Sequence, residues 1–344
     1  MKTTNYKLNF SYKKPPLIIA EISGNHNGSK SRFLKLVKKA CESKADLIKI
    51  QTYEPNDITL SSKSSSYKIK KGIWKGRYYF DLYKKACTPY KWHGAAFKIA
   101  KKNKKIIFSS PFSIRAVDFL EKLNVPIYKI ASFEITDLNL INYIASKNKP
   151  IIISTGMASI NEIRNAIKII EKHHNKIIIL HCVSNYPTKL KDTFLKNINY
   201  LKQKFKKYPI GLSDHTNNIY SSIASIPLGV VVIEKHFNFD NKKTPDSSFS
   251  INPEMMRNLK EISLDIFKST NKVKNLKILT KNLDFRRSIY TKKNIEKNEK
   301  ISPKNIISLR PKIGICSSQY YKILGKRIKK NIKANQPLFK SSLL

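Results

Sequence analysis

The sequence predicts an α/β protein: a (β/α)8 TIM barrel followed by a small β-rich domain. Eight short apolar runs alternate with helical patterns over roughly the first 270 of the 344 residues. Polar and charged residues stand where these runs end, and barrels of this class carry their active sites at the carboxyl ends of their strands. Beyond these units the alternation stops, and a lysine-rich segment leads into a shorter, turn-rich region.

The eight apolar runs are the predicted strands, and each is followed by a helical pattern or by a loop that leads to one. In chain order the strands cover residues 17–22, 46–51, 105–110, 127–131, 150–155, 176–182, 209–214 and 229–235. The first helical pattern opens at Ser29, and two later ones cover residues 113–123 and 138–145. This regular alternation of strand and helix predicts a closed parallel barrel.

One segment interrupts this rhythm. Residues 52–89 follow the second predicted strand and are rich in Ser, Lys and Tyr, with Trp74 among them. An insertion of this length at the carboxyl end of a strand commonly shapes a substrate pocket or forms a lid. We therefore expect this segment to border the active site.

The domain boundaries follow from the change in pattern. We predict a catalytic barrel over residues 1–270, a polar linker over 271–284 and a small β domain over 285–344. Residues 291–301 and 328–338 of the β domain align with each other without a gap, which indicates a compact, pseudo-symmetric unit. Asn298 and Asn335 hold equivalent positions in this repeat, and Asn tolerates the left-handed backbone of a tight turn.

Composition argues against several classes of protein. A net charge of +44 suggests nucleic-acid binding, but the lysines are scattered along the chain, and no nucleic-acid-binding motif accompanies them. The positive field instead favours anionic substrates. The four cysteines form no Cys-x-x-Cys pair, so neither a disulfide framework nor a thiolate zinc site is expected. No apolar run reaches the length of a membrane span, and we expect a cytoplasmic protein without a membrane partner.

Two histidines mark the mouth of the predicted barrel. His215 and His236 lie at the ends of successive strands. Because alternate residues of a strand face the same side, Ser213 shares a face with His215, and Glu234 shares a face with His236. Asp214 and Lys235 then point the other way. Two imidazoles at adjacent strand ends suit a divalent metal with open positions, although each could also be an ordinary structural histidine.

Two lysines stand inside otherwise apolar strands. A buried cation without a partner would cost several kcal/mol, so Lys49 and Lys129 require an anion. Serine hydroxyls lie at neighbouring strand ends, and together these groups predict a phosphate or carboxylate site. The polar residues at or just past strand ends are Glu21, Lys49, Gln51, Ser109, Ser110, Lys129, Ser132, Ser154, Tyr186, Ser213, His215 and His236.

Several motifs, in order along nearly the whole chain, resemble the sialic acid synthase family. They are Glu21-Ile-Ser-Gly-Asn-His-Asn-Gly, Lys49-Ile-Gln-Thr-Tyr, Ser109-Ser-Pro-Phe, Tyr128-Lys-Ile-Ala-Ser-Phe-Glu, Ser154-Thr-Gly-Met, Gly211-Leu-Ser-Asp-His-Thr and Glu234-Lys-His-Phe. Gly72-Ile-Trp-Lys-Gly, Ala131-Ser-Phe-Glu and Pro245-Asp-Ser-Ser-Phe-Ser are similar to the pseudaminic acid synthase branch. The resemblance implies a barrel with a carboxyl-terminal antifreeze-like (SAF) domain. It also implies condensation of phosphoenolpyruvate with 2,4-diacetamido-2,4,6-trideoxy-L-altrose, giving pseudaminic acid and phosphate.

The resemblance also assigns roles to residues. It implies that His215 and His236 hold Mn²⁺, with Mg²⁺ or Co²⁺ as alternatives, and that Glu21 and Glu134 are the acid/base candidates. The phosphoenolpyruvate cradle would consist of Lys49, Ser110, Lys129, Ser132, Ser154 and Ser213. The sugar would meet Gln51, Tyr186, Asp246 and, from the SAF domain of a partner in a domain-swapped homodimer, Arg310.

Two alternatives remain open from the sequence. Another synthase of the same family, acting on an N-acetylneuraminate or legionaminate precursor, would share the barrel, the metal and the phosphoenolpyruvate cradle. A divalent-metal aldolase acting on another 2-oxo acid would share the barrel and the metal but would not release phosphate.

Overall fold

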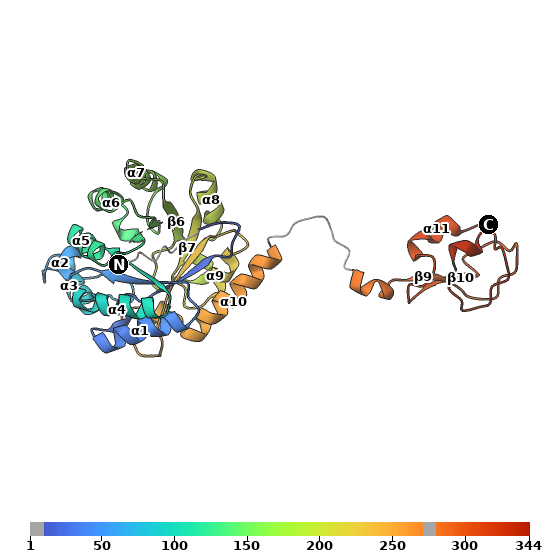
Figure 1. The fold of residues 1–344 in the computed structure, drawn as a ribbon, viewed down its shortest axis with the longest axis horizontal. Coiled ribbons are helices and arrows are strands. Elements are labelled where there is room, and N and C mark those ends of the chain that lie inside the picture. Colours follow the sequence, from blue (N-terminus) through green and yellow to red (C-terminus); the bar gives the residue numbers. More distant parts are fainter. Residues whose placement is uncertain (1–9, 271–279) are drawn as a thin grey trace. The chain divides into compact units, whose positions relative to one another are not determined.

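The computed structural model describes residues 10–270 and 280–344 of the chain. It consists of two compact units, Met1–Lys272 and Val273–Leu344. The first unit is the closed parallel barrel that the sequence predicts, and the second is a small β-rich unit (Figure 1). The predicted linker, residues 271–284, lies mostly outside the described residues; its last part belongs to a short helical segment at Thr280–Phe285.

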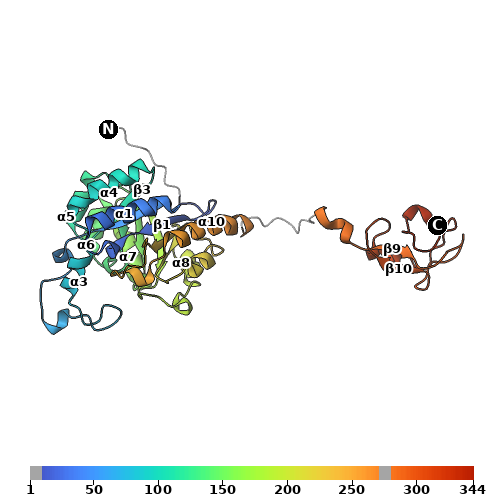
Figure 2. The same ribbon diagram turned by 90° about the horizontal axis from the view of Figure 1, so that it is seen from below.

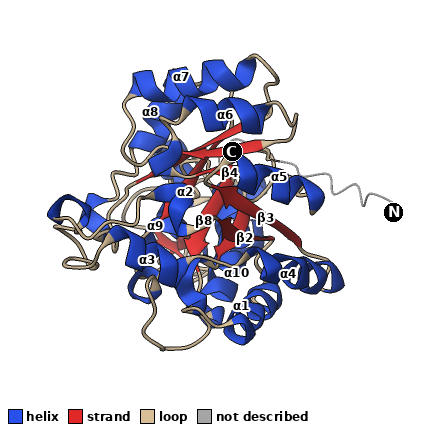
Figure 3. Ribbon diagram, turned by 90° about the vertical axis from the view of Figure 1, so that its left-hand side faces the viewer, coloured by secondary structure: helices blue, strands red, loops and turns tan. Residues whose placement is uncertain are grey.

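Eight parallel strands close the barrel in chain order, and β1 pairs with both β2 and β8. Figure 3 shows the strands in red at the centre, with helices in blue around them. The strands are β1 (Leu17–Glu21), β2 (Leu47–Thr52), β3 (Ile106–Pro111), β4 (Tyr128–Ile130), β5 (Ile151–Ser154), β6 (Ile177–Cys182), β7 (Ile210–Asp214) and β8 (Val232–His236). The last strand begins three residues later than predicted, so His236 is its final residue.

The helices lie outside the barrel, and their caps follow the sequence. Ser29 and Ser113 each accept a hydrogen bond from a backbone N–H of the first turn, which confirms the predicted starts of α1 and α5. The helices are α1 (Lys30–Glu42), α2 (Pro55–Ile58), α3 (Tyr79–Ala86), α4 (Tyr90–Lys102), α5 (Ile114–Lys122), α6 (Leu138–Ala145), α7 (Ile160–Glu171), α8 (Asn197–Lys204), α9 (Tyr220–Ser225) and α10 (Pro253–Thr270).

Apolar side chains fill the barrel at its amino-terminal end, and polar ones occupy the other end. Ile19, Phe108, Ile152 and Val232 belong to a buried cluster inside the barrel, and Phe10 packs against that cluster. A larger apolar cluster lies between the strands and the surrounding helices. The apolar inner core therefore lies directly beneath a layer of buried polar side chains at the carboxyl ends of the strands. The predicted site residues belong to this polar layer.

The segment after β2 contains two short helices, α2 and α3, joined by a loop that Figure 2 shows in light blue below α3. The indole Nε1 of Trp74 in this loop donates a hydrogen bond of 3.1 Å to the carbonyl oxygen of Pro245, in the segment after β8. The insertion is thus attached to a loop that lies 171 residues later in the chain.

The second unit is organised by its internal repeat. It contains an antiparallel pair, β9 (Ser288–Thr291) and β10 (Ile306–Leu309), and one short helix, α11 (Tyr320–Ile323). Ile295 and Ile332, which are equivalent in the repeat, exchange both backbone hydrogen bonds at 2.9 Å. Asn298 and Asn335 both have positive φ, at 68° and 61°, which confirms their expected place in left-handed turns.

Nine buried apolar residues form the core of this second unit: Ile289, Ile295, Ile301, Ile306, Ile315, Ile323, Ile328, Leu338 and Leu343. Throughout residues 10–270 and 280–344, the structure has no helix that is long and apolar enough to cross a membrane. The four cysteines are free thiols, as predicted, with Cys41 and Cys182 buried.

Candidate active site

Four charged side chains from four strands meet inside the barrel, towards the carboxyl ends of these strands. Lys49 Nζ on β2 lies 2.8 Å from Glu21 Oε2 on β1 and 3.4 Å from Glu234 Oε1 on β8. Lys129 Nζ, which reaches the group from β4, donates to both carboxylate oxygens of Glu234 at 3.0 and 3.1 Å. All four side chains are almost completely buried, so the two lysines that the sequence placed inside apolar strands do have anionic partners.

Glu234 is the partner that the sequence analysis missed. Strand parity had placed it on the same face as His236, yet no role was assigned to it. Burial alone would raise the pKa of Glu234, but Lys129 and Lys49 outweigh burial and lower it to about 2. A carboxylate in this position is therefore ionised throughout the neutral range and fixes both ammonium groups.

Glu21 has the opposite electrostatic environment. Burial raises the pKa of Glu21 to about 7; Lys49 opposes this shift, and the neighbouring Glu234 adds to it. The pKa of Lys49 is raised, because attraction to Glu21 and Glu234 exceeds the effect of burial, which alone would lower it. Burial lowers the pKa of Lys129. Glu21 can thus carry a proton near neutral pH beside two lysines.

The predicted serines surround this charged group. Ser110 Oγ lies 3.4 Å from Lys49 Nζ, and Ser213 Oγ donates to Glu234 Oε1 at 3.3 Å. Ser132 Oγ accepts a hydrogen bond of 3.1 Å from Gly156 N. Within the described residues, the buried hydroxyl of Ser154 has no hydrogen-bond partner. A free hydroxyl and two lysines at one end of the barrel suit an oxygen-rich anion.

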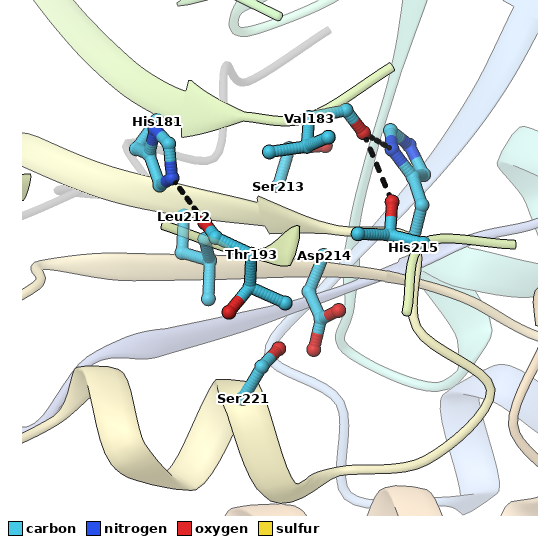
Figure 4. Close-up of a pocket in the computed structure, with 9 residues that line it drawn as sticks. His181, Val183, Thr193, Leu212, Ser213, Asp214, His215 and Ser221 are labelled. Carbon is cyan, nitrogen blue, oxygen red and sulfur yellow. Dashed lines mark hydrogen bonds between the residues drawn. The ribbon is translucent and has the colours of Figure 1, made fainter. Parts of the chain in front are cut away.

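The two histidines lie side by side, with their ring centres 5.3 Å apart. His215 Nδ1 is 2.9 Å from the carbonyl oxygen of Val183, which leaves Nε2 for another partner (Figure 4). His236 Nδ1 is buried and, in the part of the chain that the structure describes, forms no hydrogen bond. Burial and the neighbouring His215 lower the pKa of His236 well below its usual value, which keeps this ring neutral.

The neutral ring of His236 and the available Nε2 of His215 fit a divalent metal such as Mn²⁺. The pKa of His215 is raised, because interactions with Cys182 and with the Val183 carbonyl outweigh burial, so binding of a metal would compete with a proton on this ring. Among the described residues, no group of three His, Cys, Asp or Glu side chains forms a potential metal site. A metal bound here would therefore have two histidine ligands and open positions for water or substrate. Cys182 Sγ lies 3.8 Å from His215 Nδ1 and is also close to Ser132, a contact that the sequence analysis did not anticipate.

Aromatic rings from four separate segments lie on or beside the two histidines. Tyr186 packs on His215 with the ring centres 4.4 Å apart, and Phe249 packs on His236 at 4.7 Å. The ring centre of Trp74, in the insertion, lies 5.6 Å from that of Tyr186 and 6.5 Å from that of Phe249. Phe133 lies 6.5 Å from Tyr186 and is exposed. These four rings form an apolar wall beside the charged group, and residues 52–89 do border the site.

The remaining predicted residues occupy varied positions. Gln51 is half-buried two residues after Lys49 on β2. Asp246 is buried, and its Oδ2 accepts a hydrogen bond of 3.0 Å from Gly24 N, so part of its carboxylate is engaged by the loop after β1. Burial raises the pKa of Glu134 to about 7, and its Oε2 has no hydrogen-bond partner among the described residues. Arg310 belongs to the second unit, where it follows β10 and is exposed.

Comparison with known proteins places this arrangement in a family. A pseudaminic acid synthase of Helicobacter pylori is 40% identical over 331 residues, covering 94% of this chain and 97% of the relative. An N,N'-diacetyllegionaminic acid synthase of Campylobacter jejuni is 36% identical over 337 residues, 94% of this chain and 98% of the relative.

The solved structures agree with these relatives. An N-acetylneuraminic acid synthetase from Leptospira borgpetersenii, crystallised with citrate, superposes with a TM-score of 0.70 at 29% identity and covers 78% of this chain and 89% of that one. The family model of the NeuB family matches residues 36–275, and that of the SAF domain matches residues 286–344. The chain therefore belongs to the NeuB family and carries a SAF domain after its barrel.

Proposed function

We propose that this chain is a pseudaminic acid synthase, which condenses phosphoenolpyruvate with 2,4-diacetamido-2,4,6-trideoxy-L-altrose and releases phosphate. The observation that carries the proposal is the buried group of Lys49, Lys129, Glu21 and Glu234 beside two histidines and an aromatic wall. The relatives support it as well, because the pseudaminic acid synthases match at 38–40% identity, above the legionaminic acid synthases at 36% and 33%.

Phosphoenolpyruvate would bind at the two lysines. With Glu234 ionised and Glu21 protonated, the group carries one excess positive charge, which favours an anionic substrate. The hydroxyls of Ser110, Ser132 and Ser154 can donate to phosphate or carboxylate oxygens. Ser213 and Glu234 would orient the lysines, so that little rearrangement is needed when the substrate binds.

His215 and His236 would hold the divalent metal, with Mn²⁺ as the preferred ion. Bound there, the ion supplies a Lewis acid that polarises the aldehyde oxygen of the sugar. The protein's own contribution is the orientation of the two rings: the Val183 carbonyl fixes His215, and Phe249 packs on His236.

The reaction forms one carbon–carbon bond and, at C2 of phosphoenolpyruvate, replaces the C–O bond to phosphate with a C–O bond to the oxygen of water. C3 of phosphoenolpyruvate joins the aldehyde carbon of the sugar, and the aldehyde oxygen takes up a proton. Water then adds to C2, and phosphate leaves with the oxygen that linked it to C2. We assign proton donation to Glu21 and proton removal from the water to Glu134, because the pKa of each carboxyl is raised to about 7 and both can change protonation state at neutral pH.

The aromatic wall would select the sugar. Trp74, Tyr186, Phe133 and Phe249 offer apolar surface that suits the C6 methyl and the C4 acetamido group of a 6-deoxy sugar better than two hydroxyls. Gln51 and Asp246 would add polar contacts. A SAF domain from a partner subunit would complete the site through Arg310, which implies a homodimer. Phosphoenolpyruvate is a metabolite of the cell interior, so we also propose a cytoplasmic location.

The test is a measurement of phosphate release from phosphoenolpyruvate with a panel of sugars, combined with the mass of each product. We expect fast release with 2,4-diacetamido-2,4,6-trideoxy-L-altrose and a product with the mass of pseudaminic acid. Faster release with N-acetylmannosamine or with the legionaminate precursor would assign the chain to another nonulosonate synthase. A condensation product without phosphate release would identify a metal aldolase instead.

A further inference from the structure

A second buried ion pair lies on the outer face of the same two strands that carry the histidines. Lys235 Nζ on β8 is 3.2 Å from Asp214 Oδ2 on β7, and these residues are register partners in the sheet. Lys235 is 0% exposed and Asp214 is 3% exposed. Each is the sequence neighbour of a histidine, since Asp214 precedes His215 and Lys235 precedes His236. Neither side chain has a role in the condensation reaction proposed for the site.

Both members of this pair bind the loop that follows His215. Asp214 Oδ1 accepts a hydrogen bond of 2.8 Å from Thr216 N, and Lys235 Nζ donates to Thr216 O and, at 3.0 Å, to Thr216 Oγ1. Figure 4 shows the Asp214 carboxylate pointing towards Ser221 and away from the His215 ring. A side chain from β8 therefore holds the residue that directly follows the histidine of β7.

Stability alone does not account for this arrangement. A buried ion pair is weak evidence for stabilisation, because desolvation of the two charges offsets much of their attraction. The pair links the ends of β7 and β8 at the point where each strand presents its histidine, and it ties both to Thr216. Packing an apolar pair here would fill the same space without any bond to Thr216.

We propose that Asp214 and Lys235 are positioning residues that fix the spacing of His215 and His236 and thereby set the affinity of the site for a divalent ion. This inference rests on the metal site of the proposed function and extends it to residues that touch neither metal nor substrate. Positioning partners of metal ligands commonly change metal affinity by about 10- to 100-fold.

The experiment measures Mn²⁺ affinity of the purified full chain by electron paramagnetic resonance, with the free energy of unfolding from urea titration in parallel. The variants are Lys235→Met and the double variant Asp214→Asn/Lys235→Met. Loss of Lys235 alone leaves a buried charge and should destabilise the fold, whereas the double variant removes both charges and should recover stability. We expect the double variant to bind Mn²⁺ about 10- to 100-fold more weakly even so.

A matched control is available at the other end of the barrel. Lys260 Nζ of α10 lies 2.7 Å from Asp46 Oδ2, just before β2, and this pair touches neither histidine. The variant Asp46→Asn/Lys260→Met should retain wild-type Mn²⁺ affinity whatever its stability. If Asp214→Asn/Lys235→Met binds Mn²⁺ as tightly as wild type, or if the control variant loses affinity equally, the positioning role is wrong. If the wild-type chain binds no Mn²⁺, the metal site itself fails, and this inference fails with it.

Discussion

Lys49 Nζ and Glu21 Oε2 are 2.8 Å apart inside the barrel, and neither side chain is more than 4% exposed. This ion pair differs from an ordinary salt bridge, because burial raises the pKa of Glu21 to about 7 in spite of the lysine. Neutral pH therefore lies close to the point at which the pair gains or loses a proton. The affinity for a substrate anion that binds beside Lys49 should therefore depend on pH in this range.

The affinity for phosphoenolpyruvate should fall as the pH rises above 7. Ionisation of Glu21 adds a negative charge to a site that Glu234, Lys49 and Lys129 already share, and this charge repels the substrate. Between pH 7 and 9, where a phosphate ester is fully ionised, the dissociation constant should rise by up to about tenfold per pH unit. Isothermal titration calorimetry at each pH measures this. The variant Glu21→Gln should show a flat profile, and an equally steep profile in that variant would exclude Glu21 as the titrating group.

The same carboxyl has a consequence for stability. Its folded pKa is above the unfolded value of 4.5, so the folded state binds the proton more tightly. This contribution to the free energy of unfolding is fully present below pH 4.5 and is lost as the pH rises through about 7. Urea titrations of Glu21→Gln should accordingly depend less on pH across this window than those of the wild type.

Removal of the divalent ion should abolish turnover, and His236→Ala should lose most of its Mn²⁺ affinity. Loss of a metal ligand should weaken Mn²⁺ binding by more than the roughly 10- to 100-fold that follows loss of a residue that only positions a ligand. His181→Asn is a suitable control, because His181 lies on β6, faces outward and bonds to Thr193 O at 2.7 Å (Figure 4). Full activity after treatment with a chelator, or unchanged affinity in His236→Ala, would contradict the proposed metal site.

The barrel, and the facing of the site residues on its strands, were predictable because both follow from the periodicity of the sequence. Alternation of strand and helix predicts the fold, and strand parity correctly separates Ser213 and Glu234 from Asp214 and Lys235. The contact of Glu234 with Lys129 was not predictable in this way. These residues come from β8 and β4, across the barrel, and their distance depends on how the closed sheet is staggered.

The sequence predicts that the segment containing Trp74 borders the site, but the contacts of this side chain could not be predicted, for a different reason. Residues 52–89 have no strong period, so no helix or strand pattern indicates where a side chain of this segment points. Its position is specified by one hydrogen bond to Pro245 and by packing against Tyr186 and Phe249, which come from two other loops. Contacts of this kind join parts of the chain that are far apart in sequence, and only the folded structure reveals them.

The aromatic wall should control the choice of sugar. Trp74→Ala should lower kcat/KM for the 6-deoxy diacetamido sugar by about 10- to 150-fold, as expected for loss of one apolar subsite. The KM for phosphoenolpyruvate should change little. Trp74→Phe keeps apolar surface but loses the bond to Pro245, so it should fall between wild type and Trp74→Ala. Leu60→Ala, at an exposed position of the same insertion, serves as the control. An unchanged ratio of kcat/KM between this sugar and N-acetylmannosamine would contradict the role of Trp74.

Arg310 tests whether the site is completed by a second subunit. Its guanidinium can hold a carbonyl oxygen, such as that of an acetamido group, while remaining charged. Arg310→Ala and Glu21→Ala should each be nearly inactive, and Arg286→Ala, at another exposed arginine of the second unit, should retain activity.

Mixed dimers of the two inactive variants distinguish an arrangement in trans from one in cis. In an exchanged dimer, one site of each heterodimer combines an intact Glu21 with an intact Arg310, and the other site lacks both. Equal mixing gives about half heterodimers, so about a quarter of the wild-type activity should return. In cis, each subunit would lack one residue of its own site and no activity would appear. The measurement is turnover after denaturation and refolding of the mixture, with the heterodimer fraction determined by native mass spectrometry. No recovery in a confirmed heterodimer would exclude an exchanged site.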